Sequence, residues 1–344
     1  MKGNKFKGSF LSPYKIIKPF FEQQQPVTVE VHPEYRCNYN CEWCIDRKLR
    51  ELGSNKNNTS SLSEKGVRSI INSCIKLGVK GIIVSGGGEP TLNKNTELLV
   101  QLADEAGMVI GLFTNGSLLT TETIKHYIKH LSFIRFSFDE FDADNYSKTK
   151  RVPQRNYHLV LNNIKRCVTE KIVTNNTRCR IGIDFILIPT NIDKMVEIYK
   201  EVKDFKVDYL QFCDCVIIGY EFTKQRKKKI RRGLKNVLFF KEQDKCDMDV
   251  VYEPIQMENY VPCNECYVKD YIVAIGAEGD VMPCPHTTRY MELTYGNIFE
   301  TPLHKIWKNR PENLDTKLVY ENCRFRKQNE IIKGLIHVTH SEMI

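Results

Sequence analysis

The 344-residue sequence has no run of about 18 consecutive apolar residues, so nothing in it predicts a membrane-spanning helix. The first 26 residues mix basic and aromatic side chains, and they lack the apolar stretch and small-residue cleavage site of a secretory signal. A tandem repeat of solenoid length is also missing, which excludes a stacked-repeat architecture. We therefore predict a cytoplasmic protein that does not bind membranes.

Acidic residues are in the minority, because 42 Asp and Glu face 51 Lys and Arg and leave a formal net charge of +9. The densest basic run, Lys224 to Arg232, has no interleaved aromatic residue, which makes nucleic acid the less favoured partner. The run falls where a helix is expected and is typical of a solvated helix face. Its alternative use is a docking patch for an acidic partner.

The first two thirds of the chain alternate between β-rich segments and segments with apolar residues at helical spacing. The expected strands cover residues 27–31, 81–84, 109–113, 133–137, 181–188 and 207–212, and the main helices between them cover 63–78, 96–106, 121–130, 157–170 and 193–203. This alternation predicts an α/β fold, a partial TIM-type barrel of six strand-helix units, with binding loops at the carboxyl ends of the strands. A complete eight-unit barrel is the competing architecture.

The alternation fades after about residue 240, where Cys, Pro and Gly residues cluster. We therefore expect an N-terminal extension over residues 1–26, the partial barrel over 27–240 and a small cysteine-rich module over 241–344. Within the module, residues 272–275 and 281–282 flank a turn at 277–280, which predicts a β-hairpin.

Thirteen cysteines are many for a protein in a reducing compartment, where metal or cluster ligation explains them better than disulfides. Cys37, Cys41 and Cys44 follow the first expected strand with C-x3-C-x2-C spacing. A closed zinc or iron-sulfur site normally has four protein ligands, so three cysteines leave one metal position open to a small molecule. A zinc site completed by a distant residue such as His32 is the alternative.

A glycine-rich segment, Gly86-Gly87-Gly88-Glu89-Pro90, follows the second expected strand, where glycines let the backbone approach a ligand closely. The third strand ends in Thr-Asn-Gly, which is either a turn or a ligand contact. Polar residues at or near the ends of the third, fourth and sixth strands are Asn115, Ser137, Asp139 and Gln211.

In this order the motifs resemble those of the radical SAM superfamily. Its signature, C-x3-C-x-aromatic-C, is matched by Cys37, Cys41, Trp43 and Cys44, and its GGEP motif is matched by residues 87–90. The resemblance implies a four-iron, four-sulfur cluster on the three cysteines, with S-adenosylmethionine (SAM) on the open iron. Reductive cleavage of SAM would give a 5′-deoxyadenosyl radical that abstracts hydrogen from an unactivated C-H bond.

The same resemblance implies a flavodoxin- or ferredoxin-type electron donor. The SAM contacts that it implies are Trp43, Gly87, Gly88, Glu89, Asn115, Ser137, Asp139 and Gln211.

The C-terminal cysteines resemble the SPASM or twitch extension of radical SAM enzymes, through the spacing Cys266-x12-Gly279-x4-Cys284 and the following GNIFETPLHKIW. That extension binds auxiliary four-iron clusters, and a full SPASM region needs more cysteines after Cys284 than this sequence supplies. We therefore predict one auxiliary cluster, and a zinc ion is the alternative. If Cys263 is not a ligand, the site would be open. Its ligands are predicted to be Cys263, Cys266, Cys284 and Cys323.

Cys213 and Cys215, at the end of the sixth strand, are candidate hydrogen donors, because some radical SAM epimerases return a hydrogen atom through a thiol. The SPASM-like extension favours modification of a peptide, by crosslinking or epimerisation. Oxidation, epimerisation or rearrangement of a sugar, aminocyclitol or nucleotide is the alternative. A non-catalytic zinc or iron-sulfur binding protein is the further alternative.

Overall fold

A computed structural model describes residues 25–44, 46, 60–215, 223–253, 265–288, 293–312, 314, 323 and 325–337. In this part of the chain the strands form one sheet in the order β10-β9-β8-β1-β2-β3-β4-β5-β6-β7. The parallel strands that follow one another are β1 (Thr28–Val31), β2 (Gly81–Val84), β3 (Val109–Thr114), β4 (Phe133–Ser137), β5 (Arg180–Leu187), β6 (Tyr209–Asp214) and β7 (Asp249–Glu253). The six predicted strands are confirmed, and β7 is an additional parallel strand that the sequence pattern does not predict.

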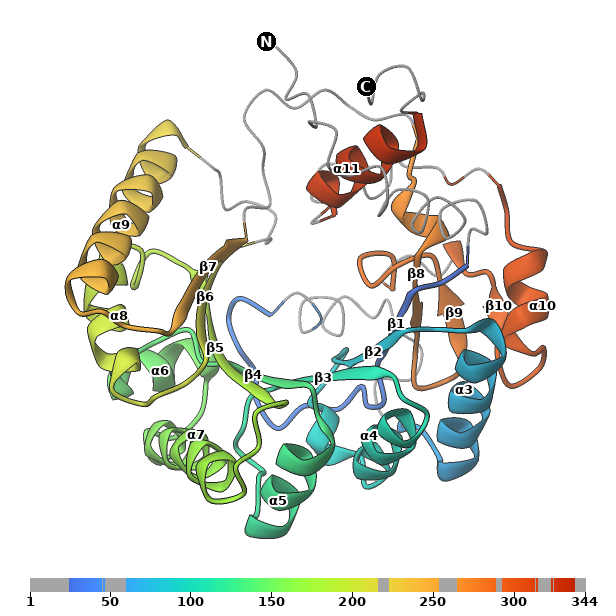
Figure 1. Ribbon diagram of the computed structural model, residues 1–344, viewed down its shortest axis with the longest axis horizontal. Coiled ribbons are helices and arrows are strands. Elements are labelled where there is room, and N and C mark those ends of the chain that lie inside the picture. Colours follow the sequence, from blue (N-terminus) through green and yellow to red (C-terminus); the bar gives the residue numbers. More distant parts are fainter. Residues whose placement is uncertain are drawn as a thin grey trace.

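Helices cover the outer, convex side of the curved sheet (Figure 1). They are α3 (Glu64–Leu77), α4 (Thr96–Glu105), α5 (Thr121–His130), α6 (Ala143–Lys150), α7 (Arg155–Val173), α8 (Met195–Lys203) and α9 (Lys224–Gln243). The predicted ends of α3 are confirmed, because Ser63 Oγ accepts a hydrogen bond from the Gly66 amide at 3.2 Å and Gly78 ends the helix with a φ of 68°. Only a residue that tolerates this left-handed backbone can end the helix in this way.

The core lies between the sheet and the helices. In β4, Ile134 and Phe136 are fully buried in it, whereas Arg135 and Ser137 are half-buried. Since side chains alternate between the two faces of a strand, Arg135 and Ser137 point to the concave side of the sheet. The concave side is therefore the polar side, as expected for a barrel that holds a site.

The C-terminal module continues the same sheet. Its strand β8 pairs in parallel with β1, so that Ile272 lies opposite Thr28 and Ile275 opposite Val31. The predicted hairpin is confirmed: β8 and β9 are antiparallel, and Gly279 in the turn has a φ of 89°. The elements of this part are η2 (Val268–Asp270), β8 (Ile272–Ile275), β9 (Asp280–Met282), β10 (Gly296–Asn297), α10 (Leu303–Lys308) and α11 (Arg326–His337), and a short helix η1 (Pro90–Leu92) follows β2.

The predicted fold class, a partial barrel with a C-terminal module, is confirmed. Strand β7 pairs with β6 beyond residue 240, so the parallel sheet extends into the region where the sequence predicts the module to begin. Within the described residues β7 and β10 are the two edges of the sheet, and no strand pairing closes it into a full barrel. None of the described helices has the length and apolar character needed to cross a membrane.

Candidate active site

The loop that follows β1 carries Cys37, Cys41 and Cys44 to the carboxyl ends of the parallel strands. Two regions distant in sequence hold it there. The Glu89 amide donates to the Arg36 carbonyl at 2.9 Å, and the Glu42 amide donates to the Thr149 carbonyl at 2.8 Å. The first bond comes from the loop after β2 and the second from the end of α6, so the cysteine loop is fixed on both sides.

The three cysteine side chains are half-buried, and the Tyr39 amide donates to Cys37 Sγ at 3.4 Å. Burial raises the pKa of the Cys37 thiol to about 12, and the nearby Cys41 and Cys44 add to the shift, so the three thiols lie within electrostatic reach of one another. No three His, Cys, Asp or Glu side chains in the described ranges surround a single metal-ion position. Three soft thiolates close together in sequence suit an iron-sulfur cluster with one iron open to a further ligand.

Two glycines bring the loop after β2 into direct contact with the cysteine loop. A Cβ atom on Gly88 would lie 2.0 Å from the Arg36 carbonyl oxygen, and one on Gly87 would lie 2.5 Å from the Tyr35 ring. Neither position has room for a side chain. The glycines therefore pack the two loops together, and their predicted contact with SAM stays a prediction.

Replacing Gly88 with alanine is expected to lower the free energy of unfolding by about 1–3 kcal/mol, because the new methyl group overlaps a backbone carbonyl that cannot rotate away. The shift in the denaturant midpoint measures this change. Gly334→Ala is the matched control, since a Cβ there meets no described atom within 4 Å. In helix α11 this control is expected to be neutral or stabilising by up to about 1 kcal/mol. Equal midpoints for Gly88→Ala and wild type would show that the loops are not packed in this way.

Glu89 is a buried carboxylate that ties the end of β2 to the end of β3. Its Oε1 accepts from the Thr91 amide at 3.1 Å and from the Thr114 hydroxyl at 2.6 Å. Its Oε2 accepts from the Asn115 amide at 2.8 Å. Burial raises the pKa of Glu89, although these hydrogen bonds oppose the shift. The side chain therefore fixes the backbone of two predicted SAM-contacting segments.

Asn115 extends this connection to the cysteine loop, because its Nδ2 donates to Asn38 Oδ1 at 2.9 Å. Its Oδ1 accepts from the Ser117 amide at 2.9 Å, as in an Asx turn. The Thr-Asn-Gly segment therefore forms a turn, as one of its two interpretations predicts. It also lies beside the cysteine loop, which is compatible with the other, a ligand contact.

Asp139 follows β4 in a strained left-handed conformation, with a φ of 65°. One carboxylate oxygen accepts from the Ile186 amide at 2.9 Å, and the other accepts from the buried ammonium group of Lys150, which also donates to the Ser137 carbonyl at 3.1 Å. Burial alone would lower the pKa of Lys150, but the Asp139 carboxylate outweighs it and the net shift is upward. Lys150 is thus a charged residue of the site that sequence reasoning missed.

A polar cluster occupies the concave side of β4, β5, β6 and β7. Gln211 Nε2 donates to Cys213 Sγ at 3.0 Å and to Glu253 Oε2 at 2.9 Å, and the Cys213 thiol donates to Asp184 Oδ1 at 3.0 Å. The guanidinium of Arg135 lies 3.4 Å from the centre of the Phe113 ring and 3.5 Å from Gln211 Oε1. The sequence predicts two site residues of this cluster, Gln211 and Cys213. It does not predict the other three members, Arg135, Asp184 and Glu253.

Cys213 and Cys215 have different surroundings. Burial raises the pKa of Cys213 well above its usual value, and the Asp184 carboxylate adds to the shift, so this side chain stays a thiol with an S-H bond. Cys215 is buried against Ile188, and Trp43 packs on the same small cluster. Trp43 therefore links the cysteine loop to the ends of β5 and β6, on the far side of the barrel mouth from β1.

The C-terminal cysteines also come together. Burial raises the pKa of Cys266 to about 12 and that of Cys284 to about 11, and Cys323 contributes to both shifts. The loop before Cys266 is held to α11, because Asn329 Nδ2 donates to the Glu265 carbonyl at 3.1 Å. The predicted fourth ligand, Cys263, lies outside the described residues.

Comparison with known families bears on both cysteine sets. Residues 32–202 match the model of the radical SAM superfamily, and residues 266–331 match the SPASM iron-sulfur cluster-binding domain. The chain belongs to the radical SAM superfamily. The first match covers the first three cysteines and the glycine loop, and the second covers Cys266, Cys284 and Cys323.

Individual relatives are distant. A probable GTP 3′,8-cyclase of Methanocaldococcus jannaschii is 26% identical over 170 residues, which are 49% of this chain and 52% of that protein. The Fe-coproporphyrin III synthase of Methanosarcina barkeri is 21% identical over 321 residues, covering 86% of this chain and 76% of that protein. This radical SAM protein thus spans about half the length of the first relative.

Solved structures with the same fold include SuiB of Streptococcus suis bound to its precursor peptide SuiA. The TM-score is 0.66 at 16% identity, over 90% of this chain and 73% of SuiB. The structure of anSMEcpe with bound AdoMet gives 0.64 at 15% identity, over 86% of this chain and 83% of that one. At these identities the likeness establishes the shared fold.

The family matches imply SAM and a four-iron, four-sulfur cluster in the radical SAM part, and iron-sulfur binding in the SPASM part. The residues present fit these groups. Cys37, Cys41 and Cys44 would supply three soft ligands and leave one position open, and Cys266, Cys284 and Cys323 lie within electrostatic reach of one another. We therefore interpret both sites as iron-sulfur sites rather than zinc sites.

Proposed function

We propose that this protein is an enzyme that cleaves SAM reductively and removes hydrogen from a C-H bond of a peptide, leading to crosslinking or epimerisation. The observation that carries the proposal is the position of the Cys37–Cys44 loop, locked to Gly88 and Glu89 at the carboxyl ends of the parallel strands. When bound, the cluster and SAM supply a 5′-deoxyadenosyl radical as the hydrogen-abstracting species.

The protein's own residues hold and orient these groups. Cys37, Cys41 and Cys44 are the proposed cluster ligands, and Glu89 fixes the strand ends beside which SAM would bind. Asp139 fixes the end of β4, because its bonds to Ile186 and Lys150 hold this strand end against β5 and α6. The proposed direct contacts with SAM stay those predicted from the sequence: Trp43, Gly87, Gly88, Glu89, Asn115, Ser137, Asp139 and Gln211.

A peptide substrate is supported by likeness over most of the chain. SuiB and anSMEcpe, whose structures have been solved with a precursor peptide and with the Cp18Cys peptide, share the fold over 90% and 92% of this chain. A nucleotide is the second candidate, because GTP 3′,8-cyclases of Methanocaldococcus jannaschii and Staphylococcus carnosus are sequence relatives over 49% and 55% of this chain. The peptide is favoured because the likeness includes the C-terminal module.

Transfer of deuterium into 5′-deoxyadenosine separates the two substrates. We expect the reduced protein to acquire deuterium from a pool of uniformly deuterated peptides, because the hydrogen that is removed ends on 5′-deoxyadenosine. Uniformly deuterated GTP at the same concentration should give none. Mass spectrometry of 5′-deoxyadenosine measures both, and deuterium from GTP alone would replace the peptide proposal with the nucleotide one.

Cys213 is the proposed hydrogen donor for an epimerisation. Its S-H bond is preserved by burial and by the hydrogen bond to Asp184, and a thiol that donates a hydrogen atom must carry that bond. The sulfur radical left behind requires one electron and one proton to restore the thiol. The proposed source of the electron is the auxiliary cluster or the external reductant.

In deuterated water, the Cys213 thiol exchanges its proton, so wild-type protein is expected to place deuterium at the epimerised carbon. Cys213→Ala should abolish this incorporation while still forming 5′-deoxyadenosine. Cys215→Ala is the matched control and should incorporate deuterium normally, since Cys215 packs against Ile188. Normal incorporation by Cys213→Ala would exclude it as the donor, and loss in Cys215→Ala alone would transfer the role to Cys215.

The remaining proposals concern partners and the second site. One auxiliary four-iron cluster is proposed on Cys263, Cys266, Cys284 and Cys323. A flavodoxin- or ferredoxin-type protein is the proposed electron donor. The cytoplasm stays the predicted compartment.

A further inference from the structure

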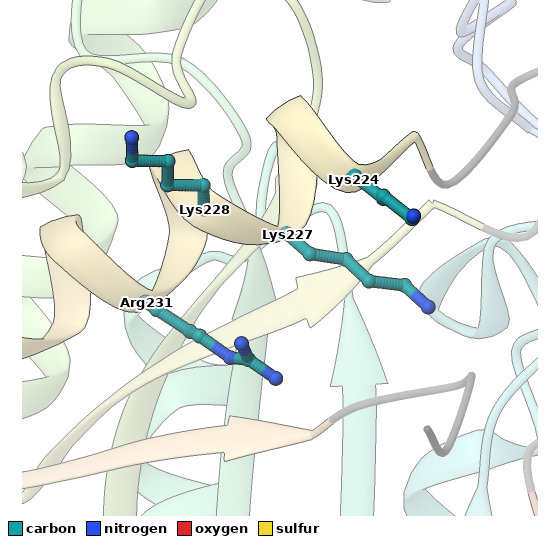
Figure 2. A pocket seen from close by; sticks show the side chains of 4 residues that line it. All are labelled: Lys224, Lys227, Lys228 and Arg231. Carbon is teal, nitrogen blue, oxygen red and sulfur yellow. The ribbon is translucent and has the colours of Figure 1, made fainter. Parts of the chain in front are cut away.

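A stripe of four cations runs along one side of α9. Lys224, Lys227, Lys228 and Arg231, here called the α9 stripe, line a cavity of about 400 Å³ (Figure 2). Their spacing of three and four residues places them on adjacent turns of one helix side. Figure 2 shows Lys224, Lys227 and Arg231 extending to one side of the helix, whereas the Lys228 side chain extends away from them.

The stripe does not serve the stability of the helix. Like charges four residues apart repel each other, and cations in the first turn oppose the positive end of the helix dipole. The first turn of α9 contains no acidic residue that would relieve this repulsion. The four charges are therefore better explained by something they bind than by the fold.

Neighbouring cations are paired, in contrast to the three lysines of the stripe. Lys229 lies 2.6 Å from Asp193, and Lys203 lies 2.8 Å from Asp244. Among the residues that the structure describes, Lys224, Lys227 and Lys228 have no carboxylate within ion-pair distance. The three lysines are thus available to an external anion.

The first turn of α9, where the stripe begins, is held at the end of β5. The helix follows β6, the strand that carries Cys213, and Arg226 in the first turn of α9 donates through Nη2 to the Leu187 carbonyl at 2.5 Å, at the end of β5. A chain bound along the stripe would therefore run toward the carboxyl ends of the strands, where the proposed chemistry takes place.

We propose that the α9 stripe binds an acidic segment of the peptide substrate. Residues 224–231 span roughly 10 Å along the helix axis, which matches about three residues of an extended peptide. Carboxylates on such a segment can meet the cations in succession, whereas one compact phosphate group reaches fewer of them. This inference rests on the proposed function, because it assigns the stripe to the peptide substrate of that reaction.

Binding of a fluorescein-labelled octaglutamate peptide, measured by fluorescence anisotropy, tests the stripe directly. Reversing three charges by Lys224→Glu, Lys227→Glu and Lys228→Glu is expected to weaken binding about tenfold or more, since each exposed ion pair contributes a modest factor. The control carries Arg232→Glu, Lys235→Glu and Lys241→Glu elsewhere on α9 and has the same net charge. It should bind within about twofold of wild type, and wild-type binding should weaken with added salt.

Equal weakening in the stripe variant and the control would overturn the proposal, because net charge alone would then explain binding. If GTP displaces the labelled peptide at a lower concentration than unlabelled octaglutamate does, the stripe binds a nucleotide and the proposal of an acidic peptide is wrong. Dithionite-driven SAM cleavage without substrate should be unchanged in the stripe variant. If the wild-type protein binds octaglutamate but cleaves no SAM, the proposed function is wrong, whereas binding of an acidic peptide by the α9 stripe is still supported.

Discussion

Cys41→Ala is expected to form no 5′-deoxyadenosine above the amount formed without protein, when reconstituted with iron and sulfide and reduced with dithionite in the presence of SAM. In the proposed cluster each of the three thiolates would bind a different iron, so loss of one would leave two protein ligands and no defined open position for SAM. Chromatography of the reaction mixture measures the product.

Cys246→Ala is the matched control for this variant. Cys246 is a half-buried cysteine that packs against the core of the fold and is not a predicted ligand of either cluster. It is expected to form as much 5′-deoxyadenosine as wild type. Product from Cys41→Ala at the wild-type rate would show that the cysteine loop does not hold the SAM-cleaving cluster.

Iron content is expected to divide between the two cysteine sets. The variant lacking Cys37, Cys41 and Cys44 should retain about four irons per chain, and a variant lacking Cys266 and Cys284 should also retain about four. The first should form no 5′-deoxyadenosine. The second keeps the ligands of the SAM-cleaving cluster and should still form it without substrate.

Metal analysis checks this division. No iron left in the first variant would rule out the auxiliary cluster, and about one zinc per chain in its place would restore the zinc alternative for the C-terminal module. The pKa shifts of Cys266 and Cys284 agree with clustered thiols in either case.

Local signals in the sequence predict much of the fold. Ser63 and Gly78 bound helix α3 because a side-chain cap and a left-handed glycine act within a few residues of the helix. Strand β7 is missed because its sequence, DVVYE, is short, has acidic residues at both ends and exposes Val251. Its place in the sheet comes from pairing with β6, about 40 residues earlier.

The cysteine positions of the site are also predictable from a local signal, since the three predicted ligands lie within eight residues. The role of Glu89 is not, because its partners Thr114 and Asn115 follow 25 and 26 residues later. The glycine motif predicts a close approach, but the nearest group in the structure is the Arg36 carbonyl.

The polar cluster around Cys213 requires the strand register. Arg135, Asp184 and Glu253 lie on three different strands, and no local pattern joins them. They meet because Asp184 pairs with Gln211 in the β5-β6 ladder and Glu253 pairs with Cys213 in the β6-β7 ladder. An arginine within the apolar segment FIRFS is the one local sign that β4 faces a polar interior.

The central claim is that the loop after β1 forms a site that cleaves SAM when reduced. The most direct measurement is the formation of 5′-deoxyadenosine and methionine by anaerobically reconstituted wild-type protein, with iron counted in the same sample. We predict both products in equal amounts, formed only after dithionite is added. Neither product from protein that carries about eight irons per chain would contradict the account.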